Sequence, residues 1–315
     1  MPNQKVVLVT GGAGFIGSHL VDRLTDQSSR VVVVDDLSRG SLDNLGGADE
    51  VAFEEMDVRS DRLARLIEQV HPELVYHLAA QCDVRVSVSN PGLDADVNIG
   101  GTINVCEAAR RSGVRRVIVA STGGCIYGEA RKIPTPETSQ SRPLSPYGIS
   151  KRVLGDYLSF YAHSSGLETI SLALSNVYGP RQDPYGEAGV VAIFLRALLR
   201  NERCTIYGDG SQTRDFVYVG DVVDAFVRAA DARAGGIVNI GTGRETSVLE
   251  LLEMCAAVAG VASVPSMAPP RPGELRRSAL DIARARRLLG WEAQVGLAEG
   301  IARTTDWIRS QVTSR

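Results

Sequence analysis

The chain has very few lysines. Only three of its 34 basic residues are lysines, at positions 5, 132 and 151, so arginine is the default cation. The five cysteines are odd in number and form no C-x-x-C pair. This argues against a disulfide framework and a thiolate metal site, and it is typical of a reducing cytoplasm. No apolar run approaches the roughly 18 residues of a bilayer span, so we expect no membrane partner. The net charge of −3 and the scattered arginines argue against nucleic acid as a partner.

What the sequence does contain is a series of short β-branched runs separated by amphipathic stretches of helical length. Continuous apolar strands that alternate with helices indicate a parallel sheet buried on both faces. The sequence therefore predicts an α/β fold with a Rossmann-type doubly wound parallel sheet. The expected strands are K-V-V-L-V-T (5–10), R-V-V-V-V-D (30–35), residues 53–58, L-V-Y-H-L (74–78), R-R-V-I-V-A-S (115–121) and E-T-I-S-L-A-L (168–174).

The texture of the chain changes after residue 175. Residues 176–190 are rich in glycine and proline, which predicts a long loop of the kind that carries function. A helix near 189–200 follows, and the runs at 215–219 and 237–243 look again like sheet. The last seventy residues are expected to be helices around a loop at 269–278. We therefore expect a Rossmann domain from 1–175 plus about 214–243, and a smaller, mostly helical substrate-binding lobe from about 176–213 plus 244–315.

The run T-G-G-A-G-F-I-G (10–17) places three glycines between the first strand and the first helix. Such glycines let backbone N–H groups approach a pyrophosphate at the positive helix N-terminus. A carboxylate 18 residues past the last glycine, at the end of the second strand, suits a ribose diol and would repel a 2′-phosphate, so we expect NAD rather than NADP. The residue pair after the third strand is placed to meet the adenine edge, with a helix cap as the alternative for its acid. These cofactor residues are Gly11, Gly14, Gly17, Asp35, Asp57 and Val58.

Tyr147 and Lys151 lie four residues apart in S-P-Y-G-I-S-K (145–151). With nine tyrosines and three lysines in 315 residues, chance gives about 0.09 such pairs (9 × 3/315). Ser145 as N-cap and Pro146 at the first helical position start a helix here, so the pair shares one face. A lysine ammonium and the positive ring of NAD would both lower the pKa of the phenol. Tyr147 could then take a proton from a substrate alcohol.

These motifs together resemble those of the extended short-chain dehydrogenases/reductases that act on nucleotide sugars, and within them the bacterial UDP-glucose 4-epimerases. The resemblance covers nearly the whole length. It is carried by the glycine turn, H-L-A-A (77–80), Asn98, S-T-G-G-C-I-Y-G (121–128), S-P-Y-G-I-S-K, N-V-Y-G-P-R-Q (176–182) and T-R-D-F-V-Y-V-G-D-V (213–222).

The resemblance implies roles for particular residues. Tyr147 would be the acid/base, Lys151 would bind the nicotinamide ribose, and Ser121 or Thr122 would hydrogen-bond the sugar 4-hydroxyl. One departure is Gly123, which stands where most of these epimerases carry the assisting hydroxyl. Further cofactor residues implied in this way are Phe15, Ile16, Leu78, Ala79, Ala80 and Asn98, and the implied substrate residues are Asn176, Val190, Arg214, Arg271 and Ser278.

The residues G-G-C (123–125) favour one reaction. Related dehydratases and decarboxylases carry acidic residues here, because elimination after C4 oxidation needs an added base and acid. Without them, the simplest chemistry is oxidation at C4, rotation of the 4-keto sugar and return of hydride to the other face. Cys125 could act as an acid or base, but a small buried hydrophobe is the more common role of such a thiol. Ser278, where a bulky tyrosine blocks N-acetyl groups in relatives, predicts that N-acetylhexosamines are also accepted.

We therefore expect a cytoplasmic NAD-dependent 4-epimerase of a UDP-hexose, with a UDP-sugar as its substrate partner and no metal. The resemblance also implies a homodimer through the helices near 96–112 and 146–162. Two alternatives stay open at this point. One is a 4-epimerase of UDP-glucuronate or another nucleotide sugar, and the other is a non-catalytic NAD-binding regulatory protein.

Overall fold

The computed structural model describes residues 5–27, 29–46, 51–184, 189–271 and 274–313. Parts of two predicted loops, residues 185–188 and 272–273, lie outside the described residues. In the described part of the chain, no helix is long and apolar enough to cross a membrane. The same residues contain no group of three or more His, Cys, Asp or Glu side chains that could hold a metal ion.

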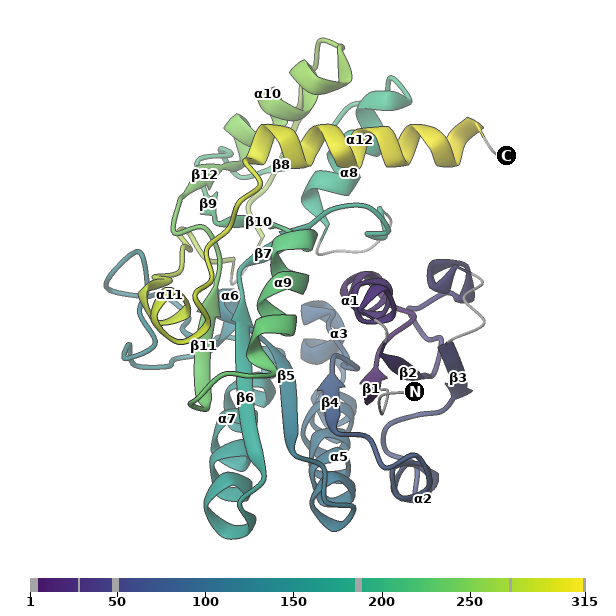
Figure 1. Ribbon diagram of the computed structural model, residues 1–315. Helices are drawn as coiled ribbons and strands as arrows, with labels where there is room; N and C mark the ends of the chain where they lie inside the picture. Colours follow the sequence, from purple (N-terminus) through teal and green to yellow (C-terminus); the bar gives the residue numbers. More distant parts are fainter. Residues whose placement is uncertain (1–4, 28, 47–50, 185–188, 272–273, 314–315) are drawn as a thin grey trace.

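A seven-stranded parallel sheet forms the larger domain (Figure 1). Its strand order is β11-β6-β5-β4-β1-β2-β3, so the order reverses between β1 and β4, and the carboxyl ends on either side of that point form the crevice where such sheets bind ligands. The predicted α/β doubly wound fold is confirmed. The strands are β1 Val6–Thr10, β2 Arg30–Asp35, β3 Val51–Glu55, β4 Leu74–His77, β5 Arg116–Thr122, β6 Glu168–Leu174 and β11 Gly236–Ile240.

Helices cover both faces of this sheet. Alternate residues of a strand point to opposite faces. Val7 and Val9 therefore pack with α1 (Phe15–Asp26) and α9 (Val219–Ala229) on one face. Leu8 packs on the other face with α2 (Arg62–Val70), α5 (Gly101–Arg111) and α7 (Pro146–Ser165). The smaller elements of this domain are a 3-10 turn Leu42–Leu45, α3 Val84–Ser89, α4 Pro91–Ala95, a π turn Asp96–Gly100, α6 Gly123–Ile126 and α11 Ala283–Leu289.

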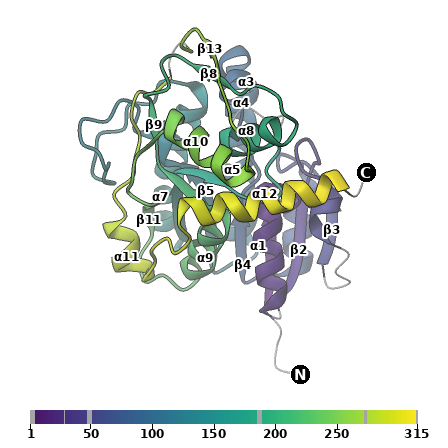
Figure 2. The same ribbon diagram turned by 90° about the horizontal axis from the view of Figure 1, so that it is seen from above.

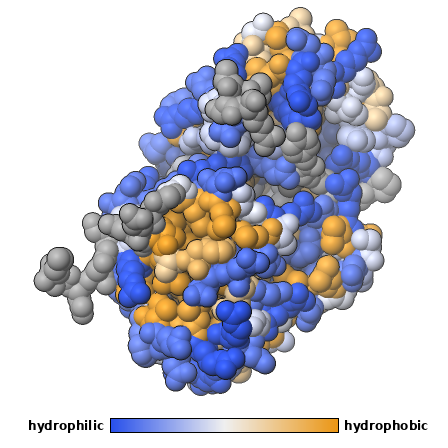
Figure 3. Space-filling view, turned by 90° about the vertical axis from the view of Figure 1, so that its right-hand side faces the viewer, coloured by the Kyte–Doolittle hydropathy of each residue, from blue (hydrophilic) through white to orange (hydrophobic). Residues whose placement is uncertain are grey.

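A smaller lobe lies over the carboxyl ends of the strands, and a third apolar cluster fills it. From above, α12 extends across the side that holds α1 and β2 (Figure 2). From the β3 side, the molecule narrows between the sheet domain and this lobe (Figure 3). The helices of the lobe are α8 Val190–Leu199, α10 Val248–Ala259 and α12 Leu297–Thr313. Its strands form two pairs: β8 Thr205–Tyr207 with β13 Ser266–Ala268, and β9 Thr213–Arg214 with β12 Thr246–Ser247.

Three sequence-based expectations differ from the structure. The third strand covers residues 51–55 rather than 53–58, because Met56 and Val58 turn away from the ladder into the core. The run at 215–219 does not join the large sheet: its strand β10 (Phe216–Tyr218) pairs with β7 (Asn176–Tyr178) between the domain and the lobe. The third difference concerns short strands: β7 lies in the segment predicted as a loop, and β8, β9, β12 and β13 were not expected. The return of the chain to the large sheet is made by β11 alone.

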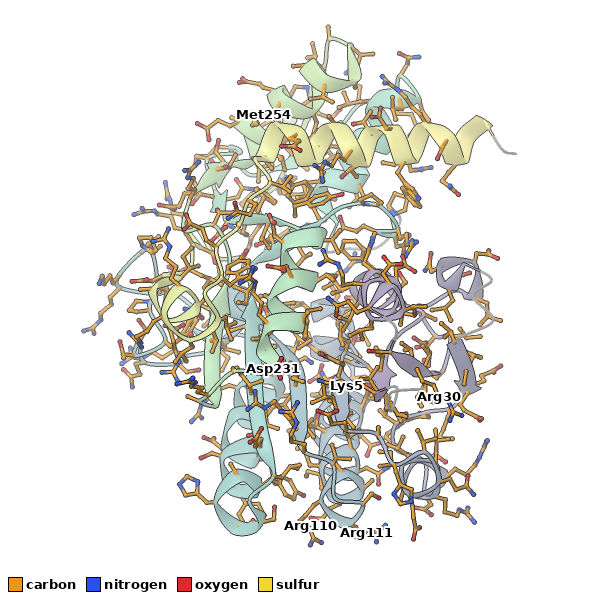
Figure 4. All side chains as sticks on the ribbon, in the orientation of Figure 1. Lys5, Arg30, Arg110, Arg111, Asp231 and Met254 are labelled. Carbon is orange, nitrogen blue, oxygen red and sulfur yellow. The ribbon has the colours of Figure 1, made fainter. Side chains whose placement is uncertain are left out.

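The amino-terminal ends of the strands, opposite the lobe, carry charged side chains. Figure 4 shows Lys5, Arg30 and Asp231 near the amino ends of the strands, with Arg110 and Arg111 at the far end of α5. The labelled Met254 lies on α10, in the distant lobe. The polar residues predicted to form a site lie instead at the carboxyl ends, which is where a doubly wound sheet binds its ligands.

Candidate active site

The glycine turn leaves the N-terminus of α1 open. Gly11 has a φ of +71°, which favours glycine, and a Cβ there would lie 2.6 Å from the Ala79 nitrogen. A Cβ at Gly17 would lie 2.0 Å from the Gly11 carbonyl oxygen. Gly14 is the N-cap and contributes no side-chain hydrogen bond, and the first turn, which begins at Phe15 and Ile16, holds no acid. The first amides of α1 are therefore available to an anion, as a pyrophosphate site requires.

Asp35 links the end of β2 to this turn. Its carboxylate is 6% exposed and accepts hydrogen bonds from the Ala13 and Leu37 nitrogens, both at 2.9 Å. Burial raises the pKa of Asp35, and these hydrogen bonds act in the opposite direction. The carboxylate therefore stands beside the glycine turn, at the strand end where a ribose diol was expected. The turn and this acid together fit NAD.

Asp57 and Val58, the pair that follows the third strand, have different surroundings. Asp57 forms an ion pair with Arg59 at 2.5 Å, and Arg59 also contacts Asp96 at 2.7 Å. The hydrogen bond from Arg59 lowers the pKa of Asp57. Asp57 is not the cap of α2, whose N-cap is Asp61. The side chain of Val58 is buried in the core, so only its backbone is a candidate for contact with an adenine.

The H-L-A-A segment lies directly beside the glycine turn. The backbone nitrogens of Leu78 and Ala79 both donate to the Thr10 carbonyl oxygen, at 3.0 and 3.1 Å. Ala80 continues this segment and is half-buried. Asn98, which is 1% exposed, holds the next residue: its Oδ1 accepts from the Gln81 nitrogen at 2.9 Å. The Asn98 side-chain amide is therefore hydrogen-bonded within the protein. It holds in place the segment after β4, on the predicted cofactor side of the site.

Lys151 lies deep on the first turns of α7. Ser145 caps this helix by accepting a hydrogen bond from the Gly148 nitrogen at 3.1 Å, and Pro146 occupies its first turn, as predicted. The Lys151 side chain is almost fully buried, and its Nζ donates to the Ala120 carbonyl oxygen at 3.0 Å. Burial lowers the pKa of Lys151 to about 8, while the Cys82 and Asp94 side chains raise it.

Tyr147 behaves differently from the sequence-based expectation. In the protein alone, burial raises the pKa of the phenol well above its usual value, and Cys125, Cys82 and Asp94 raise it further. The expected lowering by Lys151 is wrong here, because desolvation of the phenolate dominates and the ammonium bonds to a carbonyl of β5. The phenol is therefore held protonated.

The two candidate hydroxyls at the end of β5 face different partners. The Ser121 Oγ donates to the Lys151 carbonyl oxygen at 3.4 Å and is buried. Thr122 is half-buried and forms a hydrogen bond with the Cys125 thiol. A Cβ at Gly123 would lie 2.4 Å from a methyl group of Leu280, so that position faces packed protein. Thr122 is therefore the better placed of the two to reach a substrate.

Cys125 was interpreted from sequence as a small core residue, but it lies in the site. It is half-buried and acts electrostatically on Tyr147, while Arg214 of the lobe acts on Cys125. The thiol therefore interacts electrostatically both with the phenol and with an arginine, a residue type suited to a diphosphate. Burial raises the pKa of Cys125, which keeps the thiol neutral near pH 7.

The lobe supplies the residues predicted to hold the nucleotide. Arg214 is largely buried; its Nη2 donates to Glu274 at 3.0 Å and its Nη1 to the Thr213 carbonyl oxygen at 2.8 Å. The guanidinium of Arg271 lies 3.9 Å from the ring centroid of Tyr207. The ring of Tyr207 belongs to β8 and Arg214 to β9, two strands that the 208–212 turn connects.

The other predicted substrate residues lie around this strand pair. Val190 begins α8 and packs against the lobe core, while Asn176 begins β7. The Ser278 nitrogen donates to the Thr213 carbonyl oxygen at 3.2 Å, which brings Ser278 next to Arg214 in the fold. The predicted substrate residues thus lie in the lobe or, for Asn176, in the β7–β10 pair between domain and lobe, and Arg214 acts electrostatically on Cys125.

Sequence reasoning missed Asp215. This residue is 1% exposed, and its carboxylate accepts hydrogen bonds from Thr242, Gly243 and Leu280, at 2.6 to 3.2 Å. Its carbonyl oxygen also accepts from the Asn176 nitrogen at 2.8 Å. Asp215 therefore joins the strand ends where the chain passes between domain and lobe. The only sequence signal was its place beside Arg214.

Comparisons with known proteins agree with this geometry. The NAD dependent epimerase/dehydratase family matches residues 7–241. A UDP-glucose 4-epimerase of Mycolicibacterium smegmatis is 50% identical over 308 residues, covering 96% of this chain and 98% of the relative. The UDP-glucose 4-epimerase of Thermotoga maritima, solved with UDP-glucose, is 46% identical with a TM-score of 0.95, over 98% and 99% of the two chains. The Thermus thermophilus UDP-glucose 4-epimerase, solved with NAD, is 45% identical with a TM-score of 0.92, over 96% and 99%.

Proposed function

Because the chain belongs to the NAD dependent epimerase/dehydratase family, we propose that it is an isomerase that interconverts UDP-glucose and UDP-galactose at C4 with bound NAD. The observation that carries this proposal is the pairing of half-buried Tyr147 with buried Lys151 one turn apart on α7, in a domain whose glycine turn is open. Two glycines and a thiol stand at 123–125, where elimination chemistry would need a carboxylate.

Different residues of this chain have different roles in the proposed reaction. The glycine turn and Asp35 would hold the dinucleotide, and Arg214 would bind the diphosphate of the substrate. When bound, NAD would supply reversible hydride transfer at C4 and a positive ring that favours the phenolate. Tyr147 accepts the proton of the 4-hydroxyl and later gives it back. Thr122 hydrogen-bonds that hydroxyl, and Lys151 offers a positive charge to the phenolate.

Purified protein incubated with UDP-galactose, without added cofactor, tests the proposal. We expect UDP-glucose to appear in the proton NMR spectrum until the two epimers reach equilibrium. UDP-glucuronate serves as the comparison substrate, because faster epimerisation of that sugar would favour the alternative epimerase. Protein that retains NAD but changes neither sugar would instead support a regulatory role.

A wider substrate range is favoured by Ser278. Its side chain is small and half-buried, next to the strand that carries Arg214. We propose that the protein also epimerises UDP-N-acetylglucosamine. The Ser278→Tyr variant should lose this second activity and keep activity on UDP-galactose. Equal loss of both activities in the variant, or no turnover of the N-acetyl sugar by the native protein, would contradict this proposal.

A homodimer is supported by an apolar face on α3, α4 and α7, which pack against each other. This surface keeps the helix expected near 146–162, but it uses α3 and α4 in place of the helix expected near 96–112. Val88 and Phe160 are 63% and 58% exposed, and Leu93, Ile149 and Tyr157 are also exposed. The positions on α7 follow helical spacing along one face. Sedimentation should give twice the mass of one chain, and the Phe160→Glu variant should shift the protein toward monomers. A native protein that sediments as a monomer at micromolar concentration would contradict the proposal.

We propose the division of the chain that the sequence suggested: a NAD-binding domain from 1–175 plus about 214–243, and a nucleotide-sugar-binding lobe from about 176–213 plus 244–315. Two details differ from it, because Arg214 belongs with β9 in the lobe and α11 packs on β11 and α9 of the NAD-binding domain. The joining of β11 to the large sheet supports this division. We also propose a cytoplasmic location, because all five cysteines are free thiols and three of them are buried in the cores.

A further inference from the structure

Asp94 is a buried carboxylate on α4, beside α7. The residue is 1% exposed. Its Oδ1 accepts hydrogen bonds from the Gln81 Nε2 at 2.9 Å and the Asn98 Nδ2 at 3.1 Å. Its Oδ2 is buried and has no hydrogen-bond partner among the described residues. A carboxylate in this state is costly unless a positive charge lies nearby.

Lys151 is a buried cation on the helix that packs against α4. It lies on α7, against which α4 packs, and Asp94 acts on it electrostatically in the direction that favours the ammonium form. The ammonium itself is almost fully buried and bonds to a single carbonyl, that of Ala120, in the described part of the chain. Burial removes water from both groups, and the attraction between them can offset part of the hydration that each has lost.

The neighbouring titratable groups on β4, on the loop after it and on α7 carry no compensating charge near pH 7. His77, on β4, has its pKa lowered to about 3 by burial and by the Lys151 charge, so it is neutral. Burial of the thiol raises the pKa of Cys82, in the loop after β4, although the residue as a whole is exposed. Tyr147, on α7, is also held neutral by burial.

A hydrogen-bond network connects Asp94 to the helix that carries the catalytic pair. The Asn98 Nδ2, which donates to Asp94, also reaches the Gln81 carbonyl oxygen at 3.0 Å and the Ser150 Oγ at 3.2 Å. Ser150 immediately precedes Lys151, and its Oγ donates to the Tyr147 carbonyl oxygen at 3.0 Å. The network therefore joins the loop after β4, the π turn and the first turn of α7.

We propose that Asp94 is a positioning residue of the active site, whose buried carboxylate keeps Lys151 an ammonium ion beside Tyr147 and fixes the first turn of α7. The inference deepens the proposed function and rests on it for the purpose of that ammonium, which is to stabilise the phenolate during proton transfer. Asp94 itself need not touch the substrate.

The scarcity of lysine makes a direct test practical. With only three lysines in the chain, ¹³C-labelled lysine gives three side-chain signals, and Lys5 and Lys132 serve as internal references. In the NAD-saturated native protein, the Lys151 signal should be that of an ammonium ion at pH 7. In the Asp94→Asn variant, we expect its titration midpoint to fall by on the order of one pH unit, the size of shift that a nearby charge produces.

The Gln81→Met variant is the matched control. It removes the amide that donates to Asp94 but leaves the carboxylate charge, so the Lys151 midpoint should stay at its native value. The alkaline limb of the kcat profile should move to lower pH in Asp94→Asn and not in Gln81→Met. A purely structural role for Asp94 would instead lower kcat equally at all pH values.

Equal Lys151 midpoints in the native protein and in Asp94→Asn would overturn the inference. So would a neutral Lys151 at pH 7 in the native protein, a result that needs no folded variant. The midpoint is measured without turnover, so the two proposals fail separately. Absence of epimerisation with a shifted midpoint removes the proposed function, whereas epimerisation with an unshifted midpoint removes only the role of Asp94.

Discussion

Gly123 departs from the pattern of related epimerases, and the structure gives a reason that can be tested. A Cβ at this position would lie 2.4 and 2.7 Å from the two methyl groups of Leu280, whereas ordinary contacts begin at 3.4 Å. Leu280 is 1% exposed, and its nitrogen donates to Asp215 at 3.2 Å, so the backbone cannot retreat freely. The nearer methyl must therefore move by about 1 Å (3.4 − 2.4) to admit the new atom.

Gly124→Ala is the matched control for Gly123→Ala. A Cβ at Gly124 would meet only the Thr122 Oγ1, at 3.9 Å. Both glycines lie in α6, so replacement by alanine raises the helix propensity equally in the two variants. This gain therefore does not contribute to the difference between their melting temperatures. Overpacking costs about 1–3 kcal/mol. At roughly 2 °C for each kcal/mol in a chain of this size, Gly123→Ala should melt roughly 2–6 °C below Gly124→Ala.

Differential scanning calorimetry of the NAD-saturated variants measures this difference. Adding Leu280→Ala to Gly123→Ala gives a second reading, because the new methyl group would enter the cavity that the leucine leaves. The double variant should be less destabilised than the sum of the two single variants. Equal melting temperatures for the two glycine variants would refute the reasoning, and would reopen position 123 as a place for an assisting hydroxyl.

Three further predictions concern the cofactor, the substrate and pH. Gly17→Ala, which would place a Cβ 2.0 Å from the Gly11 carbonyl oxygen, should weaken NAD binding by calorimetric titration at least about tenfold, while Gly296→Ala, with open space around it, should not. Arg214→Lys should raise the KM for UDP-galactose about tenfold with a smaller change in kcat, since an ammonium cannot reproduce the fork; an unchanged KM would remove Arg214 from the substrate site. His77 has a folded pKa of about 3 against 6.5 when unfolded, so the unfolded chain binds the extra proton and stability falls as pH falls from 6.5 toward 3. His77→Gln should therefore lose less melting temperature between pH 7 and pH 4 than the native protein, and parallel losses would contradict this.

The parts of the fold with a strong periodic signal could be predicted from sequence. The strands of the large sheet are continuous apolar runs, and the start of α7 follows from Ser145 and Pro146. The short strands β7 and β10 could not be predicted in their pairing, because three residues carry no usable period. Their partners are set by tertiary contacts around Asp215.

The candidate site was predictable in its residues but not in its electrostatics. The glycines, Asp35, Tyr147 and Lys151 stand out by spacing and rarity. The direction of the pKa shift of Tyr147 depends on burial, which no spacing reveals. Asp94 and Cys125 escaped a functional prediction for the same reason: a single acid or thiol on a short helix has a role only through what the fold places beside it.

The central claim is that the Tyr147 phenol carries the proton in epimerisation at C4. The direct measurement is the rate of UDP-galactose conversion by NAD-saturated Tyr147→Phe, followed by NMR, with Tyr157→Phe on the exposed face of the same helix as control. We expect Tyr147→Phe to lose activity about 10²- to 10⁴-fold with unchanged NAD content and melting temperature, and Tyr157→Phe to keep native activity. A Tyr147→Phe variant that converts the sugar at the native rate would contradict the account.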